Sequence, residues 1–244
     1  MEIVFPDIPE YHFILKGLSS DKFVSYPKFH CEAIVEFDRE LTADVAFVPA
    51  PFAILNSHNY IFLRTGNIFS YFSGPRIFSV QGEDKELYVN EQDFVSQFYA
   101  KILLGDVSTK KGEGFPMIME PRIAMLKDQN APVKIDLYSK WTVVANDLPF
   151  PLYSGLIRKS AKPLREMVEG AITASVKYAL NNSSGIIKDI ATMYGIENIE
   201  MLKRVLFQFI NKNTLSISED EVASLKVLNQ EMERRGYAVS SLKF

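Results

Sequence analysis

Glu120, Pro121 and Arg122 form the part of this sequence that is best suited to hold a ligand. They follow the apolar run at 115–119, which predicts a buried strand. In open α/β sheets, ligand contacts lie where a strand leaves the core. Arg122 could pair with a ligand carboxylate through its planar fork, and Glu120 could accept a hydrogen bond from a hydroxyl or an amine. An internal Glu–Arg pair or a solvated turn would explain the same residues.

Two further segments follow predicted strands near the amino terminus. The apolar run at 44–48 ends at Pro49 and Ala50, where a loop could present backbone groups to a ligand, although proline alone explains why a strand stops there. Tyr11 and His12 follow the first strand. His12 could act as a base, but a surface or capping role is the simpler interpretation. We add these four residues to the predicted ligand site.

The sequence lacks the motifs of several familiar catalytic and metal sites. The histidines His12, His30 and His58 are scattered, and none has a second ligand one helical turn away, so no zinc site is predicted. There is no Ser-His-Asp arrangement, no Walker A loop and no G-x-G-x-x-G motif. We therefore predict neither a metal nor a cofactor.

The composition is that of an ordinary globular protein, with 47% hydrophobic and 23% charged residues among 244. A net charge of −3 offers no basic field to attract nucleic acid. No apolar stretch approaches the ~18 residues of a membrane span, and the amino-terminal residues do not resemble a signal peptide. The single cysteine, Cys31, excludes an internal disulfide and fits a reducing compartment. These features predict a cytoplasmic protein and indicate no particular oligomeric state.

Hydrophobic periodicity divides the chain into two parts. Short apolar or alternating runs predict strands through about residue 160, with a helix predicted at 91–104. From Pro163 the pattern is helical almost to the end, and Ser218 with Glu221 forms a capping box before the last helix. The order predicts an α/β fold that ends in a helical block.

Residues 115–158 resemble the cytosolic enzymes of the futalosine route to menaquinone, dihydroxynaphthoate synthase and chorismate dehydratase. The likeness rests on the buried strand, the Glu-Pro-Arg element, Trp141 and the Leu-Pro-x-Pro-Leu run at 148–152. Other fragments resemble the same enzymes: ADVAFVPAPFAIL at 43–55, GPRIFSV at 74–80, YALNNSSGIIKDIATMYG at 178–195 and FINKNTLSISEDEVASL at 209–225.

The resemblance implies the two-lobed fold of type II periplasmic binding proteins. Residues 1–82 with 150–244 would form lobe one, and 83–149 would form a reduced lobe two. Family members hold an acid at a helix start in lobe two, beside a pair of threonines. That pair is absent here, and Glu91 and Asp93 stand at the predicted helix start, so we expect this anion site to be lost.

The resemblance argues against the family's reaction. In the synthase the strand ends in Ile-His-Glu-Gly-Arg and the His is catalytic, whereas Met119 stands in that place here. A thioether cannot act as a general base near neutral pH. We therefore interpret the chain as a cytosolic, non-catalytic domain whose partner is a small organic molecule, acidic or aromatic. Two alternatives stay open: a lyase of the futalosine pathway that uses Glu120 or His12 as its base, and a protein-interaction remnant of the fold.

Overall fold

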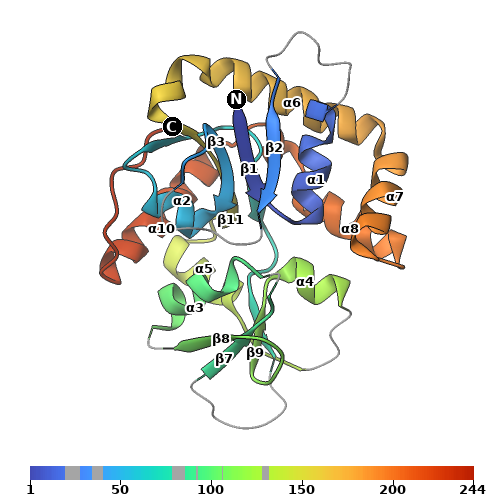
Figure 1. Cartoon of the computed structure of the whole chain (residues 1–244). Helices are drawn as coiled ribbons and strands as arrows, with labels where there is room; N and C mark the ends of the chain where they lie inside the picture. Colours follow the sequence, from blue (N-terminus) through green and yellow to red (C-terminus); the bar gives the residue numbers. More distant parts are fainter. Residues whose placement is uncertain (20–27, 35–40, 79–85, 92, 106, 128–131) are drawn as a thin grey trace.

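The computed structural model describes the chain except for residues 20–27, 35–40, 79–85, 92, 106 and 128–131. Two lobes lie one above the other, and each is built around its own β-sheet (Figure 1). The lower lobe in this view is the smaller one. The predicted two-lobed α/β fold is therefore confirmed. Within the described residues, no helix is long and apolar enough to cross a lipid bilayer.

The sheet of lobe one has the strand order β2-β1-β3-β11-β4, and β5 also pairs with β11. β1 runs parallel to β2 and β3, whereas β11 runs antiparallel to β3, β4 and β5. All but the last residue of β11 are buried, so its continuous apolar run forms a central strand. The strands are β1 (Glu2–Pro6), β2 (His30–Ile34), β3 (Val45–Pro49), β4 (Tyr60–Phe62), β5 (Ile68–Ser70) and β11 (Phe150–Arg158).

Helices pack around this sheet in two groups. α1 packs against α6, α7 and α8, whereas α2 packs against β11 and α10. The predicted helical block and the capping box of Ser218 and Glu221 at the start of α10 are both confirmed. The helices are α1 (Pro9–Leu15), α2 (Ala50–Leu55), α6 (Arg165–Asn181), α7 (Ser183–Tyr194), α8 (Ile199–Phe209), α9 (Lys212–Leu215) and α10 (Glu219–Arg234), with 3-10 turns η1 (Lys16–Ser19) and η3 (Lys159–Leu164).

The sheet of lobe two has the order β10-β6-β9-β7-β8, with β9 at its centre. Its elements are β6 (Arg76–Phe78), β7 (Glu86–Val89), α3 (Ser96–Leu104), β8 (Ser108–Lys111), β9 (Met117–Met119), α4 (Pro121–Leu126), β10 (Val133–Asp136) and α5 (Leu137–Ala145). The prediction that a helix starts at residue 91 is wrong: α3 begins at Ser96, because the Asp93 carboxylate accepts the amide hydrogens that open it. The lobe boundaries at 82 and 149 stay a prediction. β6 lies before residue 82 in the chain, and it pairs with β9 and β10 in this second sheet.

Asp136 fixes the first passage of the chain between the lobes. Its Oδ1 accepts hydrogen bonds from the amides of Gly74 at 3.0 Å and Tyr138 at 2.9 Å, and its Oδ2 accepts from Arg76 Nε at 2.9 Å. A Cβ at Gly74 would lie 2.7 Å from the Tyr138 nitrogen, so only glycine allows this close approach. One carboxylate therefore joins the linker to the start of α5.

Apolar packing holds the two lobes together near the second passage of the chain. Trp141 of α5 is fully buried, and its Nε1 donates to the carbonyl oxygens of Leu148 and Pro149 at 2.9 and 3.1 Å. Tyr99 of α3 packs on Phe150 of β11 with their ring centroids 4.4 Å apart. The contact between lobes at this end therefore combines apolar packing with one buried hydrogen bond, from the Tyr99 hydroxyl to the carbonyl oxygen of Pro151.

We expect Asp136→Ala to lower the free energy of unfolding by about 1–3 kcal/mol, because it removes a helix cap and an ion pair together. Urea denaturation would measure the change. Lys134→Ala serves as the control, since Lys134 is exposed on the same strand, β10, and should stay within about 0.5 kcal/mol of the wild type. Equal effects of the two substitutions would contradict this role of Asp136.

Candidate functional site

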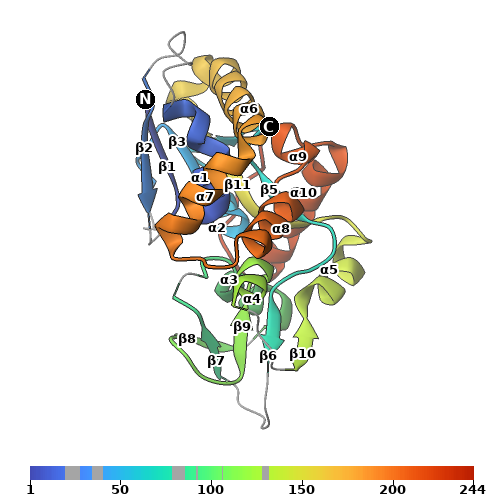
Figure 2. The ribbon, with the colours of Figure 1, turned by 90° about the vertical axis from the view of Figure 1, so that its right-hand side faces the viewer.

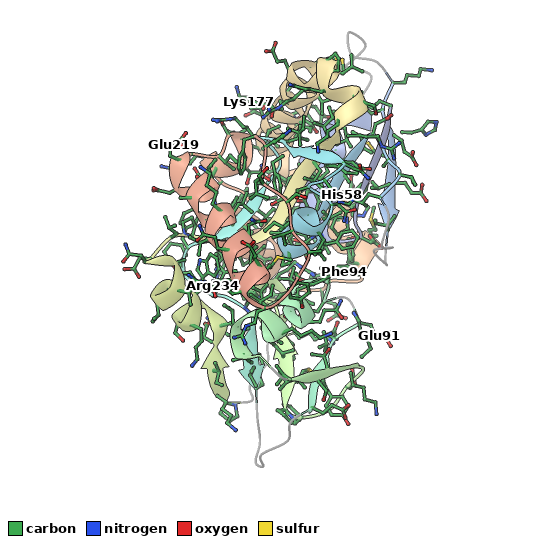
Figure 3. The ribbon with its side chains drawn as sticks, turned by 90° about the vertical axis from the view of Figure 1, so that its left-hand side faces the viewer. His58, Glu91, Phe94, Lys177, Glu219 and Arg234 are labelled. Atoms are coloured by element: carbon green, nitrogen blue, oxygen red, sulfur yellow. The ribbon has the colours of Figure 1, made fainter. Side chains whose placement is uncertain are left out.

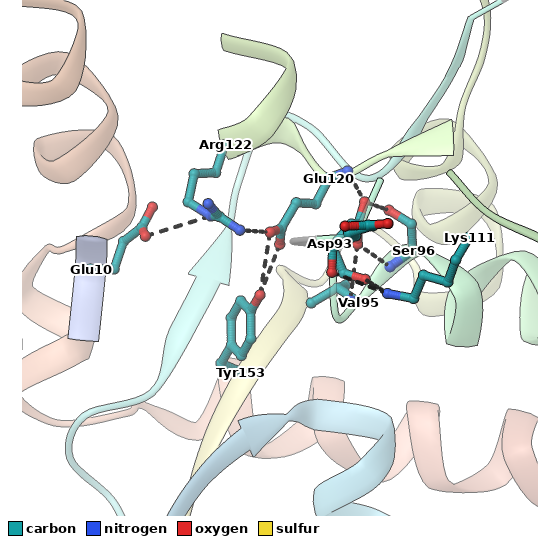
Figure 4. Close-up of polar contacts among 9 residues, drawn as sticks. Glu10, Asp93, Val95, Ser96, Lys111, Glu120, Arg122 and Tyr153 are labelled. Carbon is teal, nitrogen blue, oxygen red and sulfur yellow. Dashed lines mark hydrogen bonds and ion pairs between the residues drawn. The ribbon is translucent and has the colours of Figure 1, made fainter. Parts of the chain in front are cut away.

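Four buried polar side chains meet where the lobes face each other (Figure 4). They lie on the α4 side of the interface, away from α3 and α5 (Figure 1). Glu10 comes from α1 and Tyr153 from β11 in lobe one. Glu120 and Arg122 come from the junction of β9 and α4 in lobe two. Figure 2 shows α4 directly beneath α8 of lobe one, and the two helices are in contact. We call these four residues the interlobe cluster.

Local sequence rules place Glu120 and Arg122 at this junction. β9 ends at Met119, and Pro121 occupies the first turn of α4, where its missing N–H has no cost. Glu120 has extended backbone and precedes the helix, and Arg122 lies in its first turn. The predicted strand end with a Glu-Pro-Arg element is therefore present, and both charged side chains point to the lobe interface (Figure 4).

Arg122 lies between two carboxylates, one from each lobe. Its Nη2 donates to Glu120 Oε1, and its Nε is 3.6 Å from Glu10 Oε2. The exposed fractions of Glu10, Glu120 and Arg122 are 2%, 1% and 6%. Within the described residues, Glu10 Oε2 accepts no hydrogen bond, so its contact with Arg122 is ionic and loose. The hydroxyl of Tyr153 donates to Glu120 Oε2 at 3.0 Å and lies 3.3 Å from Oε1.

Two buried carboxyl groups sharing one guanidinium have unusual protonation. Burial raises the pKa of Glu120 to about 8, although the charge of Arg122 opposes the shift. Burial likewise raises the pKa of Glu10 against the same opposing charge. Burial alone would lower the pKa of Arg122, but the carboxylates of Glu120 and Glu10 raise it. The cluster therefore holds Arg122 charged and keeps a proton on its carboxyl groups near neutral pH, as a coupled set.

Asp93 fills the start of α3 with an internal carboxylate. Its Oδ1 accepts from the amides of Val95 at 3.0 Å and Ser96 at 2.8 Å, and its Oδ2 accepts from Ser96 Oγ at 2.6 Å. The same Oδ2 accepts from the Glu120 amide at 2.7 Å, which ties this turn to the interlobe cluster. The amides of Val95, Ser96 and Glu120 are therefore occupied by this internal carboxylate, and the loss of the family's anion site stays a prediction.

Two of the other predicted site residues, Tyr11 and Pro49, lie beside Tyr153 of the cluster, and Ala50 is the next residue after Pro49. The ring of Tyr11 packs edge-on against that of Tyr153 at 5.8 Å, and its hydroxyl donates to the carbonyl oxygen of Gly66 at 3.1 Å. Pro49 is paired with Tyr153 in the β3–β11 register. Ala50 follows as the first residue of α2, and all three are buried.

His12 belongs to a different group of side chains. Its Nε2 lies 2.9 Å from Asp7 Oδ1, which also accepts from the Tyr194 hydroxyl at 2.6 Å. It lines a cavity of about 350 Å³ together with Cys31 and other residues of α1, β2 and α7. Because residues two apart on a helix face different directions, Glu10 reaches the lobe interface and His12 does not join it.

Met119 does not offer a catalytic group. Its side chain is 1% exposed and packs in an apolar cluster with Phe78, Met117, Ile123 and Ala124. The position at which the resembled synthase carries its His is thus part of a small hydrophobic core in lobe two. Nor does the described part of the chain contain a group of three acidic, His or Cys side chains placed to hold a metal.

Sequence reasoning missed Glu10 and Tyr153. Glu10 carries a readable signal, because Phe13 and Ile14 lie three and four residues later and predict that this face of the helix is buried. A charged residue on a buried face needs a partner. Tyr153 stands inside the continuous apolar run of β11, where nothing distinguishes it from its neighbours.

Residues 106–234, more than half of the chain, match the family described as "Menaquinone biosynthesis". The chain belongs to this family. A search of curated proteins by sequence finds no match. Membership and fold together support a role in ligand binding or in chemistry related to menaquinone biosynthesis.

Solved structures show the fold of this family member. Protein AF1704 from Archaeoglobus fulgidus superposes with a TM-score of 0.80 at 16% identity, over 97% of this chain and 98% of that one. The periplasmic aliphatic sulphonate binding protein SsuA from Escherichia coli has a TM-score of 0.60 at 8% identity, over 100% and 94%. The alkanesulfonate-binding protein SsuA from Xanthomonas axonopodis pv. citri, bound to MOPS, has a TM-score of 0.57 at 11% identity, over 98% and 94%. The fold is that of the periplasmic binding proteins.

The raised pKa of Glu120 predicts a pH-dependent stability. A folded-state pKa above the unfolded value means that the folded protein holds an extra proton, so this stability is full below the unfolded pKa and is lost as the pH rises through about 8. The free energy of unfolding of the wild type minus that of Glu120→Gln should therefore fall by about 1–3 kcal/mol between pH 5 and pH 8.5. Urea denaturation across this range would measure the difference.

Glu113→Gln provides the matched control, because Glu113 is an exposed carboxyl of the same lobe. Its difference from the wild type should stay flat over the same pH range. A flat difference for Glu120→Gln as well would show that the cluster holds no extra proton.

Proposed function

We propose that this protein binds a small organic acid, aromatic acids included, between its two lobes and catalyses no reaction on it. Arg122 would hold the ligand's carboxylate. The observation that carries the proposal is a buried guanidinium at the lobe interface, held by one carboxylate from each lobe. Membership of a biosynthetic family further supports a cytosolic site of action, where such a metabolite would be met.

Opening the lobes would separate Glu10 from Arg122. Glu120 moves with Arg122, because both lie at the β9–α4 junction, whereas Glu10 belongs to lobe one. The apolar contacts of Trp141 and Phe150 can stay together as a hinge while the ionic contact at the other end separates. A ligand carboxylate would then replace the 3.6 Å contact of Glu10 with a bidentate pair, which is stronger.

Met119 supports the non-catalytic half of the proposal. The family resemblance places the catalytic His at this position, and here a thioether is packed among apolar side chains. Neither a proton donor nor a base is therefore available at that point.

Ligand binding should appear as a rise in melting temperature. At about 100 times its dissociation constant, a ligand adds about 2.7 kcal/mol of stability, which corresponds to about 5–10 °C for a chain of this size. The panel would hold benzoates, naphthoates and enol-ether carboxylates. We expect Arg122→Lys to weaken the response, because lysine keeps the charge but loses the fork.

Removing Arg122 alone leaves two buried acids without their cation, so that variant carries a folding risk. The double variant Glu120→Gln/Arg122→Gln keeps the volume, removes both charges and should abolish the response. An undiminished response in the double variant would place the ligand elsewhere. A flat response of the wild type across the panel would contradict the proposal and favour the protein-interaction alternative.

A second candidate is a lyase that uses Glu120 as its acid or base. A carboxyl whose pKa is about 8 is suited to donate or accept a proton near neutral pH, and Tyr153 orients it. Incubation of the wild type with enol-ether carboxylates, followed by proton NMR, would detect turnover. If this candidate is correct, Glu120→Gln should reduce the rate by about 10²–10⁴-fold. Absence of turnover for a ligand that binds would leave the non-catalytic proposal standing.

A further inference from the structure

A cavity of about 690 Å³ lies between the lobes outside the interlobe cluster. Lobe two contributes Lys101 from α3 with Ser108 and Thr109 from β8, and lobe one contributes Arg235 and Tyr237, which follow α10. Figure 3 shows Arg234, the neighbour of Arg235, at the foot of α10 where this helix reaches down to the second lobe. The cavity thus has a cation from each lobe.

Arg235 is held in place by features of both lobes. Its Nε donates to the carbonyl oxygen of Ile102 at 2.9 Å, in the last turn of α3, where carbonyls lack helical partners. Gly105 ends that helix with a φ of 86°, and a Cβ there would lie 3.0 Å from Arg235 Nη1. The amide of Tyr237 donates back to the carbonyl oxygen of Met232 at 3.1 Å, which sets the direction of the chain beyond α10.

The charged side chains that the structure describes in the walls of this cavity are both cationic. Among the described residues that line it, Lys101 and Arg235 are the charged ones, and neither forms an ion pair with another described residue. Hydroxyl groups of Ser108, Thr109 and Tyr237 add polar atoms to the same walls. Its volume falls within the range of about 300–1,000 Å³ that is usual for small-molecule sites.

We propose that this cavity binds a phosphorylated small anion, with Lys101 and Arg235 holding a diphosphate group, and that the bound anion holds the lobes together. Arginine forks and lysine charges are the groups that proteins use for phosphates. Because the two cations come from different lobes, an anion between them stabilises the arrangement in which the lobes meet. By linkage, it then also affects any ligand that needs the lobes to open or close. The inference does not depend on the acid site at Arg122.

Calorimetric titration with inorganic pyrophosphate at constant ionic strength tests the site. We expect Arg235→Ala and Lys101→Ala each to weaken binding by about tenfold or more, as loss of a charge-assisted hydrogen bond does. Arg234→Ala is the matched control, because Arg234 is the adjacent exposed arginine and pairs with Glu231 on the same helix. It should bind pyrophosphate as the wild type does. Tighter binding of ADP than of pyrophosphate would identify a nucleotide, and equal binding would show that the diphosphate alone is recognised.

A separate measurement tests whether the bound anion holds the two lobes together. In Glu120→Gln/Arg122→Gln, the interlobe ion pairs are gone, and we expect pyrophosphate to reduce the radius of gyration measured by small-angle X-ray scattering. No binding by the wild type would overturn the proposal, as would equal weakening in Arg234→Ala, which indicates diffuse attraction. Binding that leaves the radius of gyration unchanged would overturn the bridging role.

Discussion

The polar contact between the two lobes depends on one guanidinium that lies between two buried carboxyl groups. Arg122 belongs to lobe two, yet it pairs with Glu10 of lobe one as well as with Glu120 of its own lobe. Removing charges from water is costly, and only close pairing offsets that cost. The pair with Glu120 within lobe two is close, whereas the contact with Glu10 across the interface is long and lacks a hydrogen bond. The ionic contact between the lobes at this place is therefore weaker than the ion pair within lobe two.

The two ends of the lobe interface differ in kind. Near the second chain passage, Tyr99, Trp141 and Phe150 pack their rings together, and the Tyr99 hydroxyl donates to the carbonyl oxygen of Pro151. At the α1–α4 end the contact is ionic and protonation-dependent, because the pKa values of Glu10 and Glu120 are raised by burial. Under the proposed function, a hinge would keep the first contact and break the second, which would give access to Arg122.

The family is a biosynthetic one, whereas the residue at the position of the resembled synthase's catalytic His is an apolar Met119. The match over residues 106–234 places the chain in a menaquinone biosynthesis family, and the superposition on AF1704 shows the fold. Met119 packs in a hydrophobic cluster where the resembled enzymes carry a catalytic His, and Asp93 occupies the amides at the start of α3. Both side chains make internal contacts. The charged pair of Glu120 and Arg122 at the strand end is present beside them.

The sequence by itself determined the local elements and the position of the Glu-Pro-Arg element at the end of a buried strand. Some signals act over only a few residues, so they can be recognised directly in the sequence. They are the prolines at which strands end, the capping box of Ser218 and Glu221, and apolar periodicity. Only the tertiary structure decided that Glu10 faces Arg122, more than 100 residues away, and that His12 turns instead to Asp7. Such contacts depend on how whole lobes pack, because periodicity states which face of an element is buried but not which residue lies against it.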